Sequence, residues 1–239
     1  MRRTLASGLE VFVTVISHLR PRNIGPMTDL VGAATWIVGH GEAGDYADAP
    51  AVVEGGGLCE SRNCALDLGH DLGLPVVELS DDLRKLQRAQ SKSRADLLPL
   101  AFDDAVQLLH DTATGFGACL AGAAPTANPF FFNPKRPVRT GNFIVGDLLL
   151  VLPSRERFDT ALKLKEDYDF TLQHIRGYGS AVRCDSLLAT FLHRGNAGGA
   201  VAFRTSEREQ EAIRYLKGKW PGLLHDHPSR ADELVLRLR

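Results

Sequence analysis

The sequence is poor in cysteine and has no long apolar run. Its four cysteines are scattered and include no Cys-x-x-Cys pair, so a zinc knuckle is not expected. Four scattered cysteines in a chain of this length are typical of free thiols in a reducing cytosol. The apolar runs are shorter than the roughly 18 residues that a membrane-spanning helix needs, and no signal-peptide cleavage site follows the first residues. We therefore expect a cytoplasmic protein without membrane contacts.

The sequence also has almost no net charge. Its 28 Lys and Arg residues are balanced by 29 Asp and Glu residues, which leaves a net charge of −1. An overall basic protein is excluded, so contact with nucleic acid would need a local basic patch. Apolar residues make up 44% of the chain, which is enough to offset the entropy of ordering and excludes intrinsic disorder.

Stretches rich in β-branched residues alternate with stretches of helical periodicity. The expected strands span residues 10–17, 34–38, 51–54, 76–79, 143–152, 181–184 and 187–193. The expected helices span residues 58–72, 83–95, 99–112, 165–178 and 206–218. This alternation predicts one α/β domain, with a mixed, mostly parallel sheet flanked by helices. We expect residues 1–205 to form the core and residues 206–239 to form a C-terminal helix and tail packed on it.

Two acidic residues come directly after an expected strand. Asp81 and Asp82 follow Ser80 at the end of the strand at residues 76–79. Ligands of α/β proteins bind at the carboxyl ends of strands, and carboxylate oxygens suit Mg²⁺ or Mn²⁺, which can hold a diphosphate. An equally strong alternative is that one aspartate caps a helix that follows. Both interpretations stay open at this point.

Three histidines are candidate metal ligands. His193 ends another expected strand and is a ligand only if the fold brings it to Asp82. A lone histidine at such a position is more often structural. His225 and His227 form a rival pair, in an expected loop beside Pro228.

A second acidic group opens the expected helix at residues 165–178. Glu166, Asp167 and Asp169 lie in its first turn. One of them is a candidate general base if burial tunes its pKa, whereas compensation of the helix dipole is the more usual role. Arg62 lies near the start of another expected helix, where it is a candidate anion ligand, although a solvated arginine is more common there.

Basic residues gather in one segment. Residues 83–95 contain five of them and no acid. In a helix, Arg84, Arg88 and Lys92 would share one face because they are four residues apart.

Several motifs form one ordered series along the chain. They are R-P-x-N at 20–23, T-W-x-V at 35–38, G-L-x-x-S-R-N-x-A-L at 57–66, P-V-V-E-L-S-D-D-L at 75–83, K-E-D-Y-D-F at 165–170 and H-x-x-N-x-G-G at 193–199. This series resembles the nucleotide-sugar glycosyltransferases of the GT-A fold. The S-D-D at 80–82 takes the place of that fold's D-x-D, and the E-D at 166–167 takes the place of its acceptor-base motif.

The second half of the chain carries a narrower resemblance. The stretches concerned are N-P-F-F-F at 128–132, F-I-V-G-D at 143–147, L-K-E-D-Y-D-F-T-L-Q-H-I at 164–175, Y-G-S-A-V-R at 178–183 and N-A-G-G at 196–199. They are similar to the TET/JBP-associated glycosyltransferases of phage. The similarity covers roughly residues 11–205, and the run at 164–175 is its most specific part. Ser80 stands where many GT-A enzymes have the first Asp of this motif. The contacts of the motif are therefore expected mainly from Asp81 and Asp82.

The resemblance implies transfer of a sugar from a nucleotide sugar, such as a UDP-sugar, to DNA. The acceptor would be a 5-hydroxymethylpyrimidine, such as 5-hydroxymethylcytosine, made beforehand by a TET-like oxygenase in the cytoplasm of a phage-infected bacterium. Asp82 and His193 would hold Mn²⁺ or Mg²⁺, and Asp167 would be the base of an inverting reaction, with Glu166 orienting a substrate. The expected donor ligands are Arg20, Arg62, Ser80, Asp81, Gly198 and Gly199. The expected DNA ligands are Arg84, Arg88, Lys92, Lys135 and Arg136.

The run Phe130 to Phe132 has two interpretations. It could stack a base of the DNA, although three consecutive phenylalanines more often belong to a core.

Other functions stay open. A nucleotidyltransferase that makes sugar nucleotides also combines an α/β sheet with acidic metal ligands, but it usually has a Gly-rich loop after the first strand. The turn here is H-L-R-P-R-N, with no glycine before Gly25. A GT-A glycosyltransferase with a non-DNA acceptor and a catalytically silent DNA-binding relative are further alternatives.

Overall fold

A computed structural model describes residues 1–192 and 204–238. Across these residues, nine strands form one main sheet in the order β4-β3-β2-β5-β10-β8-β11-β9, with β1 paired to β2. The strands of this sheet are β1 (Arg2–Thr4), β2 (Glu10–Ile16), β3 (Thr35–Val38), β4 (Ala51–Glu54), β5 (Val76–Ser80), β8 (Leu120–Ala123), β9 (Val138–Thr140), β10 (Leu148–Val151) and β11 (Val182–Cys184). The helices are α1 (Ile24–Val31), α2 (Leu58–His70), α3 (Phe102–Gly115), α4 (Glu166–Tyr178) and α5 (Ser206–Lys219).

The main sheet is mixed, as expected, and most of its strands share one direction. Pairing is parallel along β4-β3-β2-β5 and between β8 and β11, whereas β1, β9 and β10 run the opposite way. The first four parallel strands have the order 3-2-1-4 in chain sequence, which is the order of a doubly wound nucleotide-binding fold. The order reverses between β2 and β5. The carboxyl ends of these two strands therefore form the topological switch point of the sheet.

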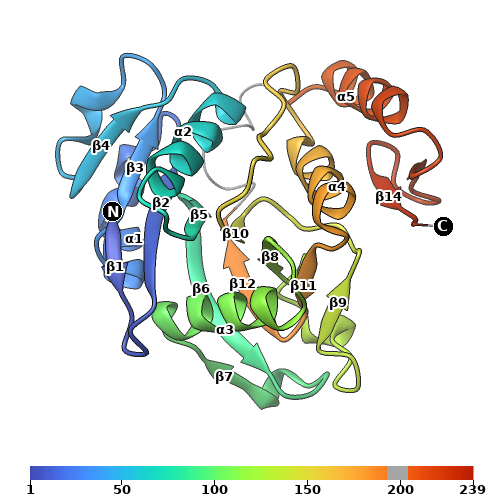
Figure 1. Cartoon of the computed structure of the whole chain (residues 1–239), viewed down its shortest axis with the longest axis horizontal. Helices are drawn as coiled ribbons and strands as arrows, with labels where there is room; N and C mark the ends of the chain where they lie inside the picture. Colours follow the sequence, from blue (N-terminus) through green and yellow to red (C-terminus); the bar gives the residue numbers. More distant parts are fainter. Residues whose placement is uncertain (193–203, 239) are drawn as a thin grey trace.

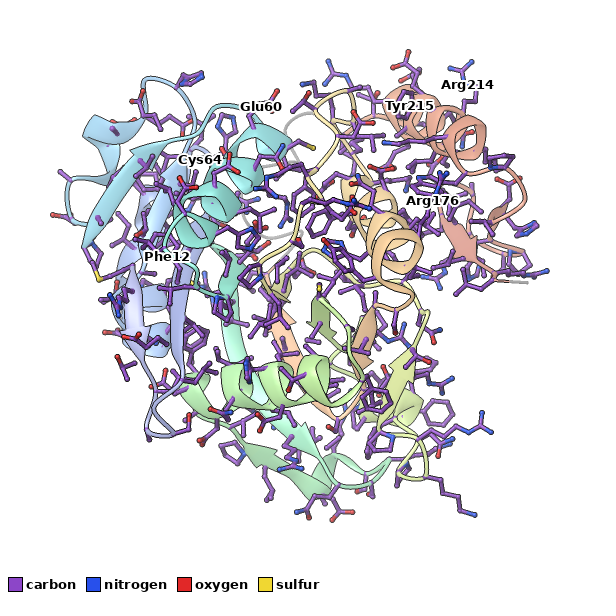
Figure 2. All side chains as sticks on the ribbon, in the orientation of Figure 1. Phe12, Glu60, Cys64, Arg176, Arg214 and Tyr215 are labelled. Atoms are coloured by element: carbon purple, nitrogen blue, oxygen red, sulfur yellow. The ribbon has the colours of Figure 1, made fainter. Side chains whose placement is uncertain are left out.

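Helices cover both faces of this sheet (Figure 1). Alternate side chains of each central strand point to opposite faces, so Val77 joins a cluster with α1 and α3, while its neighbour Val76 joins a cluster with α2 and α4. α5 adds Ala212, Ile213 and Leu216 to this second cluster. Figure 2 places Arg176 between α4 and α5, and its guanidinium lies 5.9 Å from the centroid of the Trp220 ring.

Smaller strands lie beside this layered core. β6 (Leu83–Ala89) pairs with β7 (Leu97–Pro99) and with β12 (Leu187–Phe191). β13 (Leu224–Asp226) and β14 (Leu234–Leu236) form a hairpin near α5. Short 3-10 turns are η1 (Pro21–Asn23), η2 (Ala43–Tyr46), η3 (Arg94–Asp96) and η4 (Pro129–Phe131). Within the described parts of the chain, no helix has the length and apolar character that a bilayer span requires.

The expected basic helix at residues 83–95 is wrong, because this segment forms strand β6 and a hairpin toward β7. The strand buries Leu83, Leu86 and Ala89, and it pairs with β12 and with β7. Backbone pairing on both sides outweighs the four-residue spacing of the basic side chains. Since a strand begins at Leu83, the alternative that Asp81 or Asp82 caps a helix is also wrong.

Candidate active site at the switch point

The loops after β2 and β5 meet through a buried aspartate. The carboxylate of Asp81 accepts hydrogen bonds from the hydroxyl of Ser17 at 2.5 Å and from Nη1 of Arg20 at 3.0 Å. The Tyr46 hydroxyl lies 2.7 Å from the Ser17 hydroxyl and accepts a hydrogen bond from the backbone amide of Arg20 at 2.9 Å. Burial raises the pKa of Asp81 above its usual value, while the Ser17 and Arg20 contacts oppose that rise. The R-P-x-N turn and the S-D-D motif therefore form one unit.

Asp82 lies beside the same arginine. Its side chain is only 2% exposed, and its Oδ2 lies 3.8 Å from Nη1 of Arg20. The adjacent carboxylates repel each other, and the shared guanidinium offsets part of that repulsion. The oxygens of the pair have the hard chemistry that Mg²⁺ or Mn²⁺ prefers.

Strand β12 also ends at this site, beside the ends of β2 and β5. The backbone amide of Leu192 donates a hydrogen bond of 3.2 Å to the carbonyl of Asp82, and Phe191 pairs with Leu83. The chain therefore leaves β12 beside Asp82. Position 193 itself is outside the described residues, so the contact of His193 with Asp82 stays a prediction, and the same holds for donor contacts from Gly198 and Gly199. Among the residues that are described, no group of three or more His, Cys, Asp or Glu side chains has the arrangement of a metal site.

A buried arginine joins α2, β5 and α4. Nη1 of Arg62 donates to Oε2 of Glu78 at 2.9 Å, Nη2 donates to the carbonyl of Gly146 at 2.9 Å, and Nε lies 3.3 Å from Oε1 of Glu166. Arg62 is 5% exposed and Glu78 is fully buried. Burial raises the pKa of Glu78 to about 7, against the opposing charge of Arg62. The guanidinium of Arg62 is bound to protein groups, and its expected role in holding the nucleotide stays a prediction.

Asp167 stands at the start of α4, facing the segment before β10. Its Oδ2 accepts a hydrogen bond from the amide of Gly146 at 3.2 Å, and its Oδ1 accepts one from the amide of Tyr168 at 3.0 Å. Burial raises the pKa of Asp167, and the charge of Glu166 raises it further. A carboxyl group with a raised pKa is a better proton acceptor than an ordinary aspartate near neutral pH.

Asp147 links the two acidic groups, and the sequence did not single it out. The amide of Ser80 donates to the carbonyl of Asp147 at 2.9 Å, and the Ser80 hydroxyl donates to its Oδ1 at 3.4 Å. Asp147 follows Gly146, which contacts both Arg62 and Asp167. The sequence signal that could have identified Asp147 is its place at the end of F-I-V-G-D, directly before the buried strand β10. Residues 143–147 were expected to belong to that strand, but the strand begins only at Leu148.

A small cavity opens beside Asp147. It has a volume of about 200 Å³ and lies between residues 123–127 after β8, residues 145–148 and residues 189–191 of β12. It is therefore at the same edge of the sheet as the acidic groups.

The rival histidines lie elsewhere. His225 is in β13 and is exposed, and His227 follows it, with Nε2 3.0 Å from Nη2 of Arg230. Their hairpin lies beyond α4 from the switch point (Figure 1). They do not join the acidic residues of the switch point.

The expected DNA ligands lie on β6 and on two loops. Arg84 is half-buried and donates to Oδ1 of Asn23 at 3.2 Å, whereas Arg88 is exposed. Lys92 lies in the β6–β7 hairpin, with Nζ 5.7 Å from the centroid of the Phe130 ring. Lys135 and Arg136 are exposed a few residues after Phe130. Arg84, Arg88 and Lys92 therefore do not share a helical face. Lys92 instead lies close to Phe130 in the aromatic run.

The aromatic run is mostly outside the core. Phe130 and Phe131 are each 64% exposed, and their rings meet edge to face with centroids 5.5 Å apart. Phe132 is buried against Ala89 and Leu188. The expectation that the run belongs to a core is confirmed for Phe132 and is wrong for the other two.

Comparison with known proteins finds no family model and no curated protein that matches the chain.

Proposed function

We propose that this chain is a glycosyltransferase of GT-A-like fold that transfers a sugar from a nucleotide diphosphate sugar to 5-hydroxymethylpyrimidine in DNA. The observation that carries the proposal is the meeting of two acidic groups at one sheet edge. Asp81 and Asp82 follow β5 at the switch point, and Asp167 begins α4. Ser80, Asp147 and Gly146 connect them through hydrogen bonds and adjacent backbone.

The switch point between β2 and β5 suits the nucleotide sugar. Nucleotides bind at such switch points in doubly wound sheets. A divalent metal would bind Asp82, with His193 as the further expected ligand, and would neutralise charge on the leaving diphosphate. Arg20, which already faces both aspartates, adds a fixed positive charge on the same side.

Asp167 suits the role of the base. The acceptor hydroxyl gives its proton to the Asp167 carboxylate while its oxygen forms the bond to the anomeric carbon. The bond from that carbon to the diphosphate breaks, so attack from the opposite side inverts the sugar. Glu166 is held by Arg62, and its charge keeps the pKa of Asp167 raised in addition to the effect of burial.

The exposed aromatic and basic residues suit single-stranded or locally opened DNA. A base that is stacked in a duplex is out of reach of the half-buried Asp167 carboxylate, so it must be flipped out or unpaired. Exposed Phe130 and Phe131 provide π-faces for stacking. Lys92 provides positive charge beside Phe130, and exposed Lys135 and Arg136 follow a few residues later in the chain. The net charge of −1 makes this a local patch and not a property of the whole surface.

The test is mass spectrometry of nucleosides from hydroxymethylated DNA incubated with the protein, Mn²⁺ or Mg²⁺ and a panel of nucleotide sugars. We expect one nucleoside to gain the mass of a sugar, with release of the nucleoside diphosphate. Asp167→Asn is the matched negative control, because it keeps the size of the side chain. A nucleotidyltransferase would instead release pyrophosphate from a nucleoside triphosphate and a sugar phosphate, and it would leave the DNA unchanged.

A further inference from the structure

The cavity beside Asp147 has the dimensions of one small ring. Its volume is about 200 Å³, and cavities of roughly 150 Å³ hold a benzene-sized molecule. One substituted six-membered ring fits, whereas a base together with its sugar and phosphate does not. The cavity therefore accepts a single group that projects from a larger ligand.

The lining of the cavity offers both apolar walls and polar partners to a flat heteroaromatic ring. Small and apolar side chains such as Ala123, Val145 and Phe191 outnumber its polar side chains, which are Thr126, Thr190 and Asp147, and polar atoms also form a large share of its surface. A pyrimidine has two apolar faces and polar groups only at its edge.

We propose that this cavity receives the acceptor pyrimidine and that Asp147 accepts a hydrogen bond from the exocyclic amine of cytosine. The inference rests on the proposed function and identifies cytosine as the acceptor nucleobase. Carboxylates recognise cytosine through this amine. Uracil has a carbonyl oxygen at the same position, and that oxygen would face the carboxylate of Asp147 without a proton between them. The enzyme should therefore prefer 5-hydroxymethylcytosine to 5-hydroxymethyluracil.

The position of Asp147 relative to Asp167, the proposed general base, fits this assignment. In 5-hydroxymethylcytosine the amine and the hydroxymethyl group are on adjacent ring carbons, so their two protein partners must also be neighbours. Asp147 and Asp167 are joined through Gly146, whose amide donates to Asp167. Besides burial and the Glu166 charge, the charge of Asp147 raises the pKa of Asp167, as expected for two nearby carboxylates.

The experiment compares kcat/KM for matched oligonucleotides that carry 5-hydroxymethylcytosine or 5-hydroxymethyluracil. We expect the wild type to prefer cytosine by at least tenfold. Asp147→Asn should reduce that preference at least tenfold, because an amide can also donate to the uracil oxygen. Asp111→Asn, at an exposed site on α3, is the matched control and should keep the preference.

A second variant tests the cavity independently of Asp147. Ala127→Phe adds a ring at a half-buried loop position that lines the cavity, so it should reduce transfer to DNA at least tenfold, while a thermal unfolding midpoint close to that of the wild type shows that it folds. Equal transfer to both bases by the wild type, or wild-type transfer by Ala127→Phe, would overturn the inference and leave the proposed function standing. A change of donor-sugar preference in Asp147→Asn would assign the cavity to the donor and also overturn it. If the wild type transfers to neither base, the proposed function fails, and this inference fails with it.

Discussion

The backbone amide of Gly146 donates a hydrogen bond of 3.2 Å to the carboxylate of Asp167. The carbonyl of Gly146 accepts from Arg62 at the same time. One peptide segment before β10 thus fixes both the candidate base and the arginine that holds its neighbour Glu166. A methyl group at position 146 would lie 2.7 Å from Nη2 of Arg62 and 3.5 Å from Cβ of Asp167. The buried guanidinium has little room to move, because Glu78 binds it from the other side.

Gly146→Ala should therefore lower transfer more than it lowers stability. The added methyl displaces Arg62 or the backbone at Gly146, and a small displacement of a general base is costly in rate. We expect at least a tenfold loss of kcat. Gly115→Ala, at a position where a methyl meets no neighbour, is the control. Wild-type kcat in Gly146→Ala would show that this packing does not position Asp167.

Asp167→Asn should remove transfer and keep donor binding. General bases contribute roughly 10²–10⁴-fold to rate, so we expect a loss in that range. The raised pKa of Asp167 also sets the pH dependence. The carboxylate must be unprotonated to accept a proton, so the wild-type rate should rise with pH through the raised pKa and then level off. A pH profile of kcat in the wild type and the variant checks both. A near-wild-type rate in the variant would leave Asp167 as a helix-dipole residue.

The two aspartates of the S-D-D motif should behave differently. Asp82→Ala should abolish donor turnover while the fold survives, because Arg20 keeps its hydrogen bond to Asp81. Asp81→Ala should destabilise the protein, since Ser17 and Arg20 both lose a buried partner. Thermal unfolding and release of the nucleoside diphosphate, measured over a Mn²⁺ titration, separate the two effects. Full turnover by Asp82→Ala in the presence of a chelator would exclude the metal role.

Much of the fold follows from local sequence patterns. Strands β2, β3 and β5 were expected because they combine β-branched residues with turn signals, and α4 was expected from its acidic first turn. Residues 83–95 were mispredicted because strand pairing with β7 and β12 is a long-range effect that helical spacing does not report. Leu148, and not Phe143, begins β10 for a similar reason: the segment before it turns toward Arg62 and Asp167.

The site was only partly accessible from the sequence. Asp81, Asp82 and Asp167 were identified from strand ends and motif order, and the structure gathers them at one sheet edge. The sequence did not show that Arg62 is buried between Glu78 and Glu166. The local pattern at the start of a helix does not determine whether an arginine there faces solvent or a central strand. Asp147 was missed because residues 143–147 were expected to be part of a strand, whereas β10 begins only at Leu148.

Glu78 should make stability depend on pH. Its pKa rises from an ordinary 4.5 to about 7 in the folded protein, chiefly through burial. The folded state then binds more protons than the unfolded state between these values, so the free energy of unfolding should fall as the pH rises through this window. Asp167 adds a slope of the same sign. Glu78→Gln should flatten the dependence in urea unfolding measured from pH 4.5 to 8, whereas Glu211→Gln, on the exposed side of α5, should not. An unchanged slope in Glu78→Gln would mean that Glu78 stays ionised throughout.

DNA binding should depend on the hairpin and loop near Phe130. Lys92, Lys135 and Arg136 are exposed there, so changing all three to Glu should weaken binding and make its salt dependence shallower, by about 0.7–0.9 in log–log slope per lost phosphate contact. Changing Phe130 and Phe131 to Ala should cost about 1–3 kcal/mol per stacked base and leave the salt slope unchanged. Fluorescence anisotropy with a single-stranded oligonucleotide at several salt concentrations measures both effects.

The matched control for the basic patch uses exposed arginines far from it. The backbone amide of Arg155 donates to the Tyr178 hydroxyl at the end of α4, Arg214 is in α5, and Arg237 directly follows β14. Changing these three to Glu alters the net charge by the same amount as the patch variant. If binding depends only on net charge, both triple variants lose the same salt slope and the patch has no special role. A local interface requires that only the variant near Phe130 changes the slope, because counterions are released only where phosphates contact the protein.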